Sequence, residues 1–283
     1  AGVAVGGLTA AEATEEVRAF FTQPLELALG AQTLSVRPYF LGARARIATA
    51  VAAALASPAD TVVPLQVTIS SRVLRAWVER RAKKFRRKPA SARVALAGLR
   101  PRIVASRPGR ALVKSLSRSR LRTALLAHRR AARLPVRSIR PAITARQLGP
   151  AVVIRRGSRR LTLFRGSKPG RMRVAASFPV AVGMPSYPTP LGSFRVRTKT
   201  RNPWWYPPNQ PWAEGASPIP PGPGNPLGTR WMGLGGGVGI HGTPNSGSIG
   251  SAASHGCIRM LIPSAEWLYE RVRLGTPVFI VAA

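Results

Sequence analysis

Acidic residues are scarce in this sequence. Only nine of its 283 residues are Asp or Glu, and Asp60 is the sole aspartate. Residues 150–283 contain just Glu214, Glu266 and Glu270. Hard cations such as Mg²⁺ and Ca²⁺ are bound by several oxygen ligands, and most glycoside hydrolases act through two paired carboxyl groups. The composition therefore argues against a hard-metal enzyme and against a glycosidase.

Cysteine and histidine are equally rare. The chain has one cysteine, Cys257, and three histidines, of which His128 lies in an Arg-rich segment far from the other two. A single cysteine cannot form an intramolecular disulfide, so it gives no information about an oxidising compartment. Because a tetrahedral zinc site requires about four Cys, His or carboxylate ligands, we expect no metal site.

Long apolar runs are also lacking. The longest Ala-rich run, Ile47 to Ala56, is about half the ~20 residues that a membrane-spanning helix requires. The chain begins at Ala1 rather than Met. We expect a signal peptide or membrane anchor that this chain does not include.

Positive charge is abundant. The chain has 44 Lys and Arg residues, a formal net charge of +35 and an isoelectric point near 12.0. A basic run at residues 80–88 is compatible with nucleic-acid binding, but zinc-finger spacing, an RNP-like aromatic motif and a heptad-bearing basic region are all missing. An anionic cell wall would attract the same surface, and the frequent use of arginine that often accompanies a high-GC genome would also produce it. We expect anionic wall polymers as partners and no specific nucleic acid.

The first half of the chain is typical of an α+β domain. Thr9 and Glu12 form a capping-box pattern ahead of an apolar helix. The expected helices cover residues 10–21, 43–55, 72–86 and 117–132, and the expected strands cover 62–69, 92–97 and 102–105. Pro135, Pro141 and Pro150 mark a linker. We therefore predict a first domain at residues 1–148 and a second at 149–283.

The second half is predicted to be mainly β. Short β-prone runs separated by Gly and Pro occupy residues 151–155, 160–164, 171–182, 192–198, 231–234 and 277–281. One helix is expected at residues 264–272, with Ser264 as its N-cap. The long loop at residues 202–228 contains Trp204, Trp205, Tyr206 and Trp212. These aromatic residues indicate an ordered loop, a wall or lid beside a groove.

Residues 241–257 contain the only cysteine and two of the three histidines. A thiol with an ordinary pKa of ~8.5 is only a few per cent thiolate at neutral pH, so a catalytic cysteine needs a base or a positive field nearby. An imidazole, with a pKa of ~6.5, is the usual partner. His255 lies two residues before Cys257, and His241 ends an apolar strand-like run.

The glycines around these residues complete the parts of an acyl-transfer site. Gly256 allows close backbone approach, and the N–H groups of Gly256 and Cys257 are candidates for an oxyanion hole. No Asp or Glu lies within residues 241–257, so we expect the Gly242 carbonyl or Ser254 to orient the base. The alternative is that Cys257 is a small buried apolar residue, which would leave the Cys-His grouping unexplained.

These residues resemble the signature of the YkuD-type L,D-transpeptidases, an HG dipeptide followed after a short loop by [ST]HGC and an apolar residue. In this chain the signature comprises His241 to Thr243 and Ser254 to Arg259. Further segments resemble the family in the same order, at Pro179 to Val196, Asn202 to Trp205, Pro220 to Leu234 and Gly275 to Ile280. The resemblance covers residues 151–283.

The resemblance implies a mainly-β L,D-transpeptidase catalytic domain that attacks the L-to-D peptide bond of a peptidoglycan tetrapeptide stem. Cys257 would be the nucleophile, forming a thioester and releasing D-alanine. His241 matches the general base, with the Gly242 carbonyl as its orienting group, and His255 matches a residue that supports the site near the oxyanion hole. No metal or organic cofactor is implied.

Two further residues are expected to contact substrate. Arg259 stands where some members have Asn, and it would pair with a substrate carboxylate or else be a surface arginine. Thr243 completes the first part of the signature. A second stem as acceptor would give a 3-3 cross-link, whereas water would make the protein an L,D-carboxypeptidase. A noncatalytic wall-binding or polyanion-binding protein is the third alternative.

The first half has a looser resemblance. The run from Gly6 to Thr9, followed by Glu12 and Ala13, and the segment from Val73 to Leu126 look like the peptidoglycan-binding module that often precedes such catalytic domains. A spacer that holds the enzyme away from a membrane is the alternative. Both interpretations place the protein outside the cytoplasm, in the cell wall or associated with a membrane.

Overall fold

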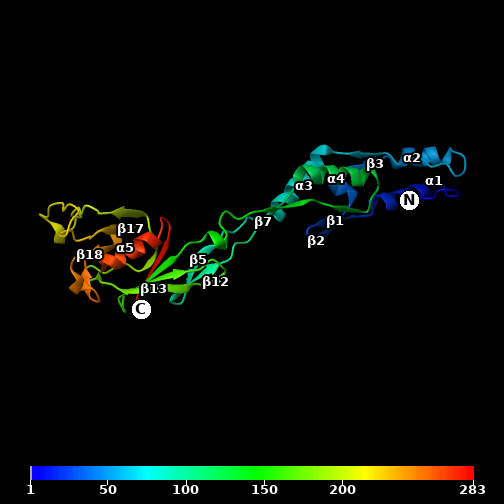
Figure 1. Cartoon of the computed structure of the whole chain (residues 1–283). Helices are drawn as coiled ribbons and strands as arrows, with labels where there is room; N and C mark the ends of the chain where they lie inside the picture. The colour runs from blue at the N-terminus through cyan, green and yellow to red at the C-terminus, as the bar shows by residue number, and fades with distance from the viewer. Residues whose placement is uncertain (1) are drawn as a thin grey trace. The chain divides into compact units, whose positions relative to one another are not determined.

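The computed structural model describes residues 2–283, which form two compact units (Figure 1). The first comprises the residues up to Ala90 and Pro108–Arg140, and the second comprises Ser91–Arg107 and Pro141–Ala283. A single division at residue 148 would leave Ser91–Arg107 in the first unit. In the structure these residues belong to the second unit because they cover one face of its largest sheet.

The first unit combines helices with three small sheets. The strands β1 (Leu25–Leu29), β2 (Gln32–Val36) and β8 (Ala131–Arg133) form one sheet in the order β2-β1-β8. The other two are the pairs β3 (Ala43–Ala45) with β4 (Val67–Ile69), and β7 (Gly109–Leu112) with β9 (Val136–Ile139). Helices α3 (Ser71–Phe85) and α4 (Lys114–Leu126) bury Trp77 and Leu121 against the leucines of β1. Helices α1 (Ala10–Thr22) and α2 (Ile47–Leu55) pack on each other, and η1 (Pro38–Leu41) is a 3-10 helix.

Predictions for the first unit were correct where they depended on residues close together in the sequence, and wrong where a distant strand pairs with the segment. The Thr9–Glu12 capping box is present at the start of α1. The helix expected at 43–55 is wrong in its first turn, because residues 43–45 pair with β4. The helix expected at 117–132 begins at Lys114 and ends at Leu126, since residues 131–133 pair with β1. The strand expected at 62–69 shortens to Val67–Ile69, and part of the expected linker forms β9, paired with β7.

The second unit is built on a five-stranded sheet with the order β13-β11-β10-β21-β15. These strands are β10 (Ala151–Arg155), β11 (Arg160–Arg165), β13 (Arg173–Pro179), β15 (Gly192–Arg195) and β21 (Pro277–Val281). Val152 and Ile154 point into the main core, whereas Ala151 and Val153 point to the other face. That face is covered by the hairpin of β5 (Arg93–Ala97) and β6 (Arg100–Val104), extended by β12 (Gly170–Arg171). Burial of both faces explains the continuous apolar run in β10.

A second sheet carries the residues of interest. Its order is β16-β17-β18-β20, formed by β16 (Thr198–Arg201), β17 (Arg230–Gly235), β18 (Val238–Thr243) and β20 (Ile258–Leu261). Helix α5 (Ile262–Arg271) packs on β17 and β18 (Figure 1). The two sheets and α5 share one apolar core, which includes Leu161, Met232, Ile240, Met260 and Leu268. The pair β14 (Val182–Gly183) and β19 (Ala252–Ser254) and the 3-10 helices η2 (Ala145–Gln147), η3 (Pro211–Ala213) and η4 (Ser246–Ser248) complete the unit.

The mainly-β character predicted for the second half is confirmed. The strand expected at 171–182 is wrong as a single element, because it is divided among β12, β13 and β14, which pair with three different strands. The expected helix begins at Ile262 with Pro263 in its first turn. Ser264 therefore lies inside α5 and is not its N-cap.

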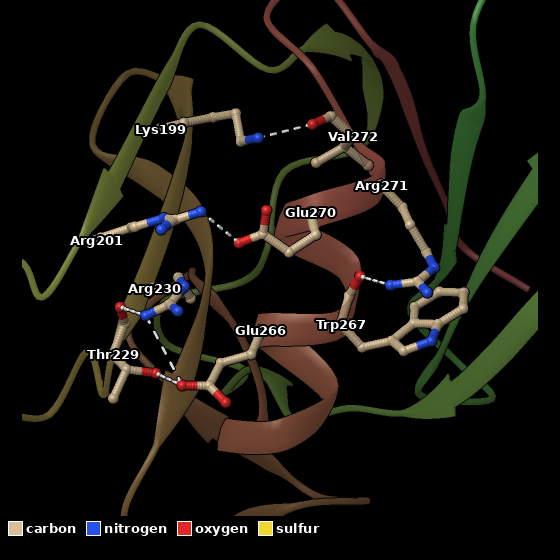
Figure 2. Close-up of polar contacts among 9 residues, drawn as sticks. All are labelled: Lys199, Arg201, Thr229, Arg230, Glu266, Trp267, Glu270, Arg271 and Val272. Carbon is tan, nitrogen blue, oxygen red and sulfur yellow. Dashed lines mark hydrogen bonds and ion pairs between the residues drawn. The ribbon is translucent and has the colours of Figure 1, made fainter.

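Polar contacts attach α5 to β16 and β17 (Figure 2). Glu270 pairs with Arg201 at 2.9 Å, and Glu266 accepts a hydrogen bond from the Thr229 hydroxyl at 2.7 Å. The Lys199 ammonium donates to the Val272 carbonyl at 2.7 Å and lies 4.1 Å from the Tyr269 ring centroid. Two of the three carboxylates in this half of the chain thus hold the helix on the sheet. No helix formed by the described residues is both long and apolar enough to cross a membrane.

Candidate active site

The pairing of two strands far apart in the sequence brings the candidate residues together. β18 and β20 are parallel, with Ile240 beside Ile258 and His241 beside Arg259. Continuing this register by one residue places Gly239 beside Cys257. Side chains alternate along a strand, so Cys257 and Arg259 project on the same side of the sheet as His241.

His241 is buried, with 3% of its surface exposed. Its Nδ1 lies 2.6 Å from the Gly242 carbonyl oxygen. Because a carbonyl only accepts, Nδ1 must hold a proton, and in the neutral ring Nε2 has a free lone pair. Burial lowers the pKa of His241 to about 4, the Gly242 carbonyl partly opposes this, and the charge of Arg259 lowers the pKa further. The imidazole is therefore neutral at pH 7 and able to accept a proton.

An indole ring covers His241. Trp231, opposite it on β17, stacks on the imidazole with centroids 5.8 Å apart and 28° between the planes. The indole fits there because residue 239 is glycine. A Cβ on Gly239 would lie 2.4 Å from the indole. Gly239 thus permits the packing that buries the imidazole.

Cys257 directly precedes β20 and is partly buried. Its Sγ lies 3.5 Å from the Gly237 carbonyl oxygen, and no hydrogen bond joins it to a histidine among residues 2–283. Burial raises the pKa of the thiol, while the Gly239 backbone and the Arg259 charge act in the opposite direction. The resting pair at neutral pH is therefore a thiol and a neutral imidazole, and the thiol proton must move when sulfur attacks.

A tight turn positions Cys257. The Ser254 hydroxyl donates to the Cys257 carbonyl at 2.6 Å and accepts the Gly256 N–H at 3.2 Å. Gly256 has φ +106°, a conformation that other residues rarely adopt. The Gly256 N–H is thus occupied, whereas the Cys257 N–H has no acceptor among the residues described. Of the two proposed orienting groups, the Gly242 carbonyl contacts His241, while Ser254 holds the turn.

His255 lies between two aromatic rings. Trp212 stacks on it at a centroid distance of 3.9 Å and an interplanar angle of 8°, and Tyr187 meets it edge-on at 5.1 Å. Burial lowers the pKa of His255, and the Arg259 charge lowers it further. This environment fixes the ring by packing, which suits a supporting residue better than a base.

The loop at residues 202–228 is ordered, as its aromatic residues indicated. Asn225 is fully buried, and its amide donates to the carbonyls of Pro203, Ile219 and Pro220. Trp212 is the aromatic residue of this loop that reaches a candidate residue, whereas Trp204 stacks on Tyr206 and is half exposed. The loop also lines a cavity of about 450 Å³ together with Thr229 and Ile262.

The two predicted substrate contacts differ in their surroundings. Arg259 is half-buried, and its backbone exchanges two hydrogen bonds with Ala181. Its charge affects the pKa of Cys257, His241 and His255, so the guanidinium lies within electrostatic reach of all three. No ion pair of the described residues includes Arg259. The Thr243 side chain is buried, and its hydroxyl accepts the Asn245 N–H at 3.2 Å, which holds the turn after β18.

Sequence reasoning did not identify the roles of Trp231, Tyr187 and Gly239. Tyr187 lies within a segment that resembles the family, and Gly239 lies in a glycine-rich run, but neither position indicated its contact. Trp231 was recognised only as part of a strand. Among residues 2–283 no group of three or more His, Cys, Asp or Glu side chains is placed to bind a metal ion.

Residues 149–280 match the family model described as the L,D-transpeptidase catalytic domain, YkuD. The chain is 34% identical over 137 residues to YqjB of Bacillus subtilis (strain 168), named as an L,D-transpeptidase, covering 46% of this chain and 70% of that protein. It is 37% identical to YkuD of the same organism, covering 38% of this chain and 54% of that one. With YbiS of Escherichia coli (strain K12) the identity is 33%, with 35% of each chain covered. The chain thus spans only part of the latter two relatives.

Solved structures are also similar. A crystal structure of the Enterococcus faecium L,D-transpeptidase C442S mutant aligns over 93% of this chain and 97% of its own, at 17% identity and a TM-score of 0.40. An NMR structure of the catalytic domain from the E. faecium enzyme aligns over 47% of this chain and 96% of its own. For that pair the identity is 26% and the TM-score is 0.36.

Proposed function

Because this chain belongs to the YkuD family of L,D-transpeptidases, we propose that it forms 3-3 cross-links in peptidoglycan through a thioester on Cys257. L,D-transpeptidases act on peptidoglycan stem peptides. The observation that supports the residue assignment most directly is the parallel pairing of β18 with β20. It sets His241 beside Arg259, which follows Cys257 by two residues in the chain. We assign the chemistry to residues 149–283.

Acylation starts from the neutral thiol of Cys257 and the neutral imidazole of His241. The Cys257 sulfur attacks the carbonyl carbon of the L-to-D peptide bond in a tetrapeptide stem, and the thiol proton moves to Nε2 of His241. The Cys257 N–H donates to the oxygen that becomes negative. When the C–N bond breaks, the imidazolium returns its proton to the leaving amine, and D-alanine departs. The thioester remains on sulfur, with the imidazole neutral again.

Deacylation uses the same groups in reverse. An amine of a second stem attacks the thioester carbon and loses a proton to His241. The C–S bond breaks, the thiolate recovers the proton, and the new amide is the cross-link. The Gly242 carbonyl keeps the Nδ1 proton in place throughout, so that Nε2 remains the proton-transfer atom. No metal or organic cofactor is required for these steps.

The remaining residues position the reactants. The Arg259 guanidinium is available for a substrate carboxylate, because no acidic partner occupies it among the described residues. His255, held between Trp212 and Tyr187, supports the wall of the site. Gly256 and Ser254 shape the turn that presents the Cys257 N–H. Thr243 is buried and contributes through the turn after β18, where its hydroxyl accepts the Asn245 N–H.

The first half of the chain has a separate proposed role. We assign the first unit, the residues up to Ala90 and Pro108–Arg140, to an α+β module that binds the wall or acts as a spacer, and the protein to an extracytoplasmic location, in the wall or near a membrane. The large positive charge agrees with an anionic environment.

A mass-spectrometric experiment tests the acylation step. The full chain is incubated with tetrapeptide muropeptides, and its intact mass is measured over time. We expect an adduct equal to the stem minus D-alanine, located on the peptide that contains Cys257, and no adduct with Cys257→Ala. If Cys257→Ala releases D-alanine at the wild-type rate, the assignment of the nucleophile is wrong.

The products separate the alternatives. Cross-linked dimers with a 3-3 bond support the transpeptidase, whereas tripeptide stems without dimers would make the protein an L,D-carboxypeptidase. Binding to wall material with neither adduct nor products would make it a noncatalytic wall-binding protein.

A further inference from the structure

The first unit contains a basic pocket that is separate from the residues proposed for catalysis. It has a volume of about 630 Å³, within the range of roughly 300 to 1,000 Å³ that is usual for ligand sites. The cations Arg37, Arg80, Arg81 and Lys84 line it, together with the aromatic side chains of Phe40 and Trp77. We name it the basic pocket.

Helix periodicity explains how one wall of the basic pocket arises. Trp77, Arg80, Arg81 and Lys84 have the spacing i, i+3, i+4 and i+7, so they lie on one face of α3. Trp77 is anchored in the core, and the Arg81 guanidinium lies 5.5 Å from its ring centroid. The buried indole of Trp77 therefore supports Arg81, one of the cations in this row.

The opposite wall comes from the segment around η1. Arg37 directly precedes η1, and Phe40 within it is 59% exposed. An exposed aromatic ring therefore lies beside the Arg37 cation, and both line the same concavity as the cations of α3. Such a wall offers apolar contact to a ligand that also has negative charge.

The basic pocket contains no carboxylate. None of the residues that line it is acidic. Glu79 is the only acidic residue in α3, and it lies on the opposite face, where it pairs with Lys114. The positive charges of the pocket are therefore not neutralised by the lining residues, and they face an open concavity.

From these features we propose that the basic pocket binds phosphodiester groups of an anionic cell-wall polymer. Guanidinium groups bind phosphate oxygens through paired hydrogen bonds, and an ammonium binds them as a point charge. Arg80 and Lys84 are one helical turn apart, about 5 to 6 Å, so one polymer can contact both through neighbouring phosphates. Phe40 and the edge of Trp77 contact the carbon atoms between the phosphates. The choice of a wall polymer over nucleic acid rests on the proposed function.

The test compares two charge-matched variants of the full chain. Arg80→Gln with Lys84→Gln removes two exposed cations from the basic pocket, and Arg72→Gln with Arg75→Gln removes two exposed cations from the opposite face of α3. Binding of a fluorescent glycerol-phosphate oligomer is measured at several salt concentrations. We expect the pocket variant to bind about tenfold or more weakly and its log Kd to depend less on log salt, by a slope of about one to two. The opposite-face variant should remain near wild type.

Two competing polyanions identify the ligand. If both double variants bind the glycerol-phosphate oligomer equally weakly, the oligomer is attracted by net charge alone and the proposed site is wrong. Tighter pocket-dependent binding of single-stranded DNA of equal charge, or of poly-L-glutamate, would overturn the wall phosphodiester as its ligand. Phe40→Ala should weaken binding without changing the salt dependence. All of these variants should acylate Cys257 at the wild-type rate, so failure of this proposal is distinguishable from failure of the proposed catalytic function.

Discussion

The indole of Trp212 lies flat on the imidazole of His255, with centroids 3.9 Å apart and 8° between the planes. This contact joins the long loop at residues 202–228 to the turn that precedes Cys257, the proposed nucleophile. Burial is the largest cause of the lowered pKa of His255. The loop therefore affects the electrostatics of the site as well as its shape.

Removal of that indole should change the titration of His255. Trp212→Leu exposes the imidazole to water, and we expect its pKa to rise toward the ordinary value near 6.5, because hydration stabilises the charged form. NMR titration of the ring carbon protons measures this. Trp204→Leu, which removes an indole stacked on Tyr206 instead, is the matched control. An equal shift in both variants, or none in Trp212→Leu, would contradict the role of the contact.

Substitution of each histidine in turn should show which one is the general base and which one supports the site. His241→Gln should slow acylation by about 10² to 10⁴, the contribution of a positioned general base. His255→Gln should reduce the rate much less, since its ring is held by aromatic packing. Stopped-flow or quenched-flow measurement of acyl-enzyme formation gives both rates. If His255→Gln slows acylation severely and His241→Gln only mildly, His255 is the general base and His241 the supporting residue.

Buried His241 should make folding sensitive to acid. Its pKa falls from 6.5 to about 4 on folding. As the pH drops below about 6.5, the unfolded chain therefore binds a proton that the folded chain does not, and stability decreases until the pH reaches about 4. The loss attributable to this group is on the order of 3 kcal/mol. Urea denaturation at pH 7 and at pH 4 checks this, and His241→Gln should lose less stability between the two. An identical pH dependence in wild type and variant would disprove it.

The Ser254 hydroxyl should be needed for the turn that presents Cys257. Ser254→Ala leaves the Gly256 N–H and the Cys257 carbonyl without their partner. We expect about 1 to 3 kcal/mol of lost stability and slower acylation. Ser254→Thr keeps the hydroxyl and should restore most of both. Ser251→Ala removes a comparable hydroxyl bond, to the Ser248 carbonyl, and should acylate normally.

A methyl group on Gly239 should disturb His241 indirectly. Its Cβ would lie 2.4 Å from the Trp231 indole, so Gly239→Ala must displace the ring that stacks on His241. Overpacking of this kind costs about 1 to 3 kcal/mol, and we expect acylation to slow with it. The double variant with Trp231→Leu should recover stability, measured by thermal unfolding, but not the full rate. Full recovery of the rate would show that the indole has no part in positioning the imidazole.

Several features followed from short-range interactions that the sequence displays directly. The capping box of α1 depends on Thr9 and Glu12 alone. The β-prone run at residues 151–155 predicted the strand β10, because the β-branched residues in it favour extended backbone. The grouping of Cys257 with His241 and His255 indicated the type of chemistry, because an imidazole is the usual partner that activates a catalytic thiol whatever the fold around it.

Other features depended on contacts between residues far apart in the chain. Parallel pairing of β18 with β20 set His241 beside Arg259, and no local pattern specifies a strand's partner. The same limit explains why residues 43–45 and 131–132 lie in strands where helices were expected, since a neighbouring strand outweighed local preference.

The sequence by itself determined which residues are candidates for the chemistry and the mainly-β character of the half that contains them. Tertiary structure alone decided the state of those residues. It buried His241 under Trp231 of another strand, and burial lowered the pKa of the imidazole to about 4. It also set His241 beside Arg259, whose charge lowers that pKa further. The physical reason is that residue types define which protons can move, whereas burial and neighbouring charges define their free energies, and both arise only when distant strands pack.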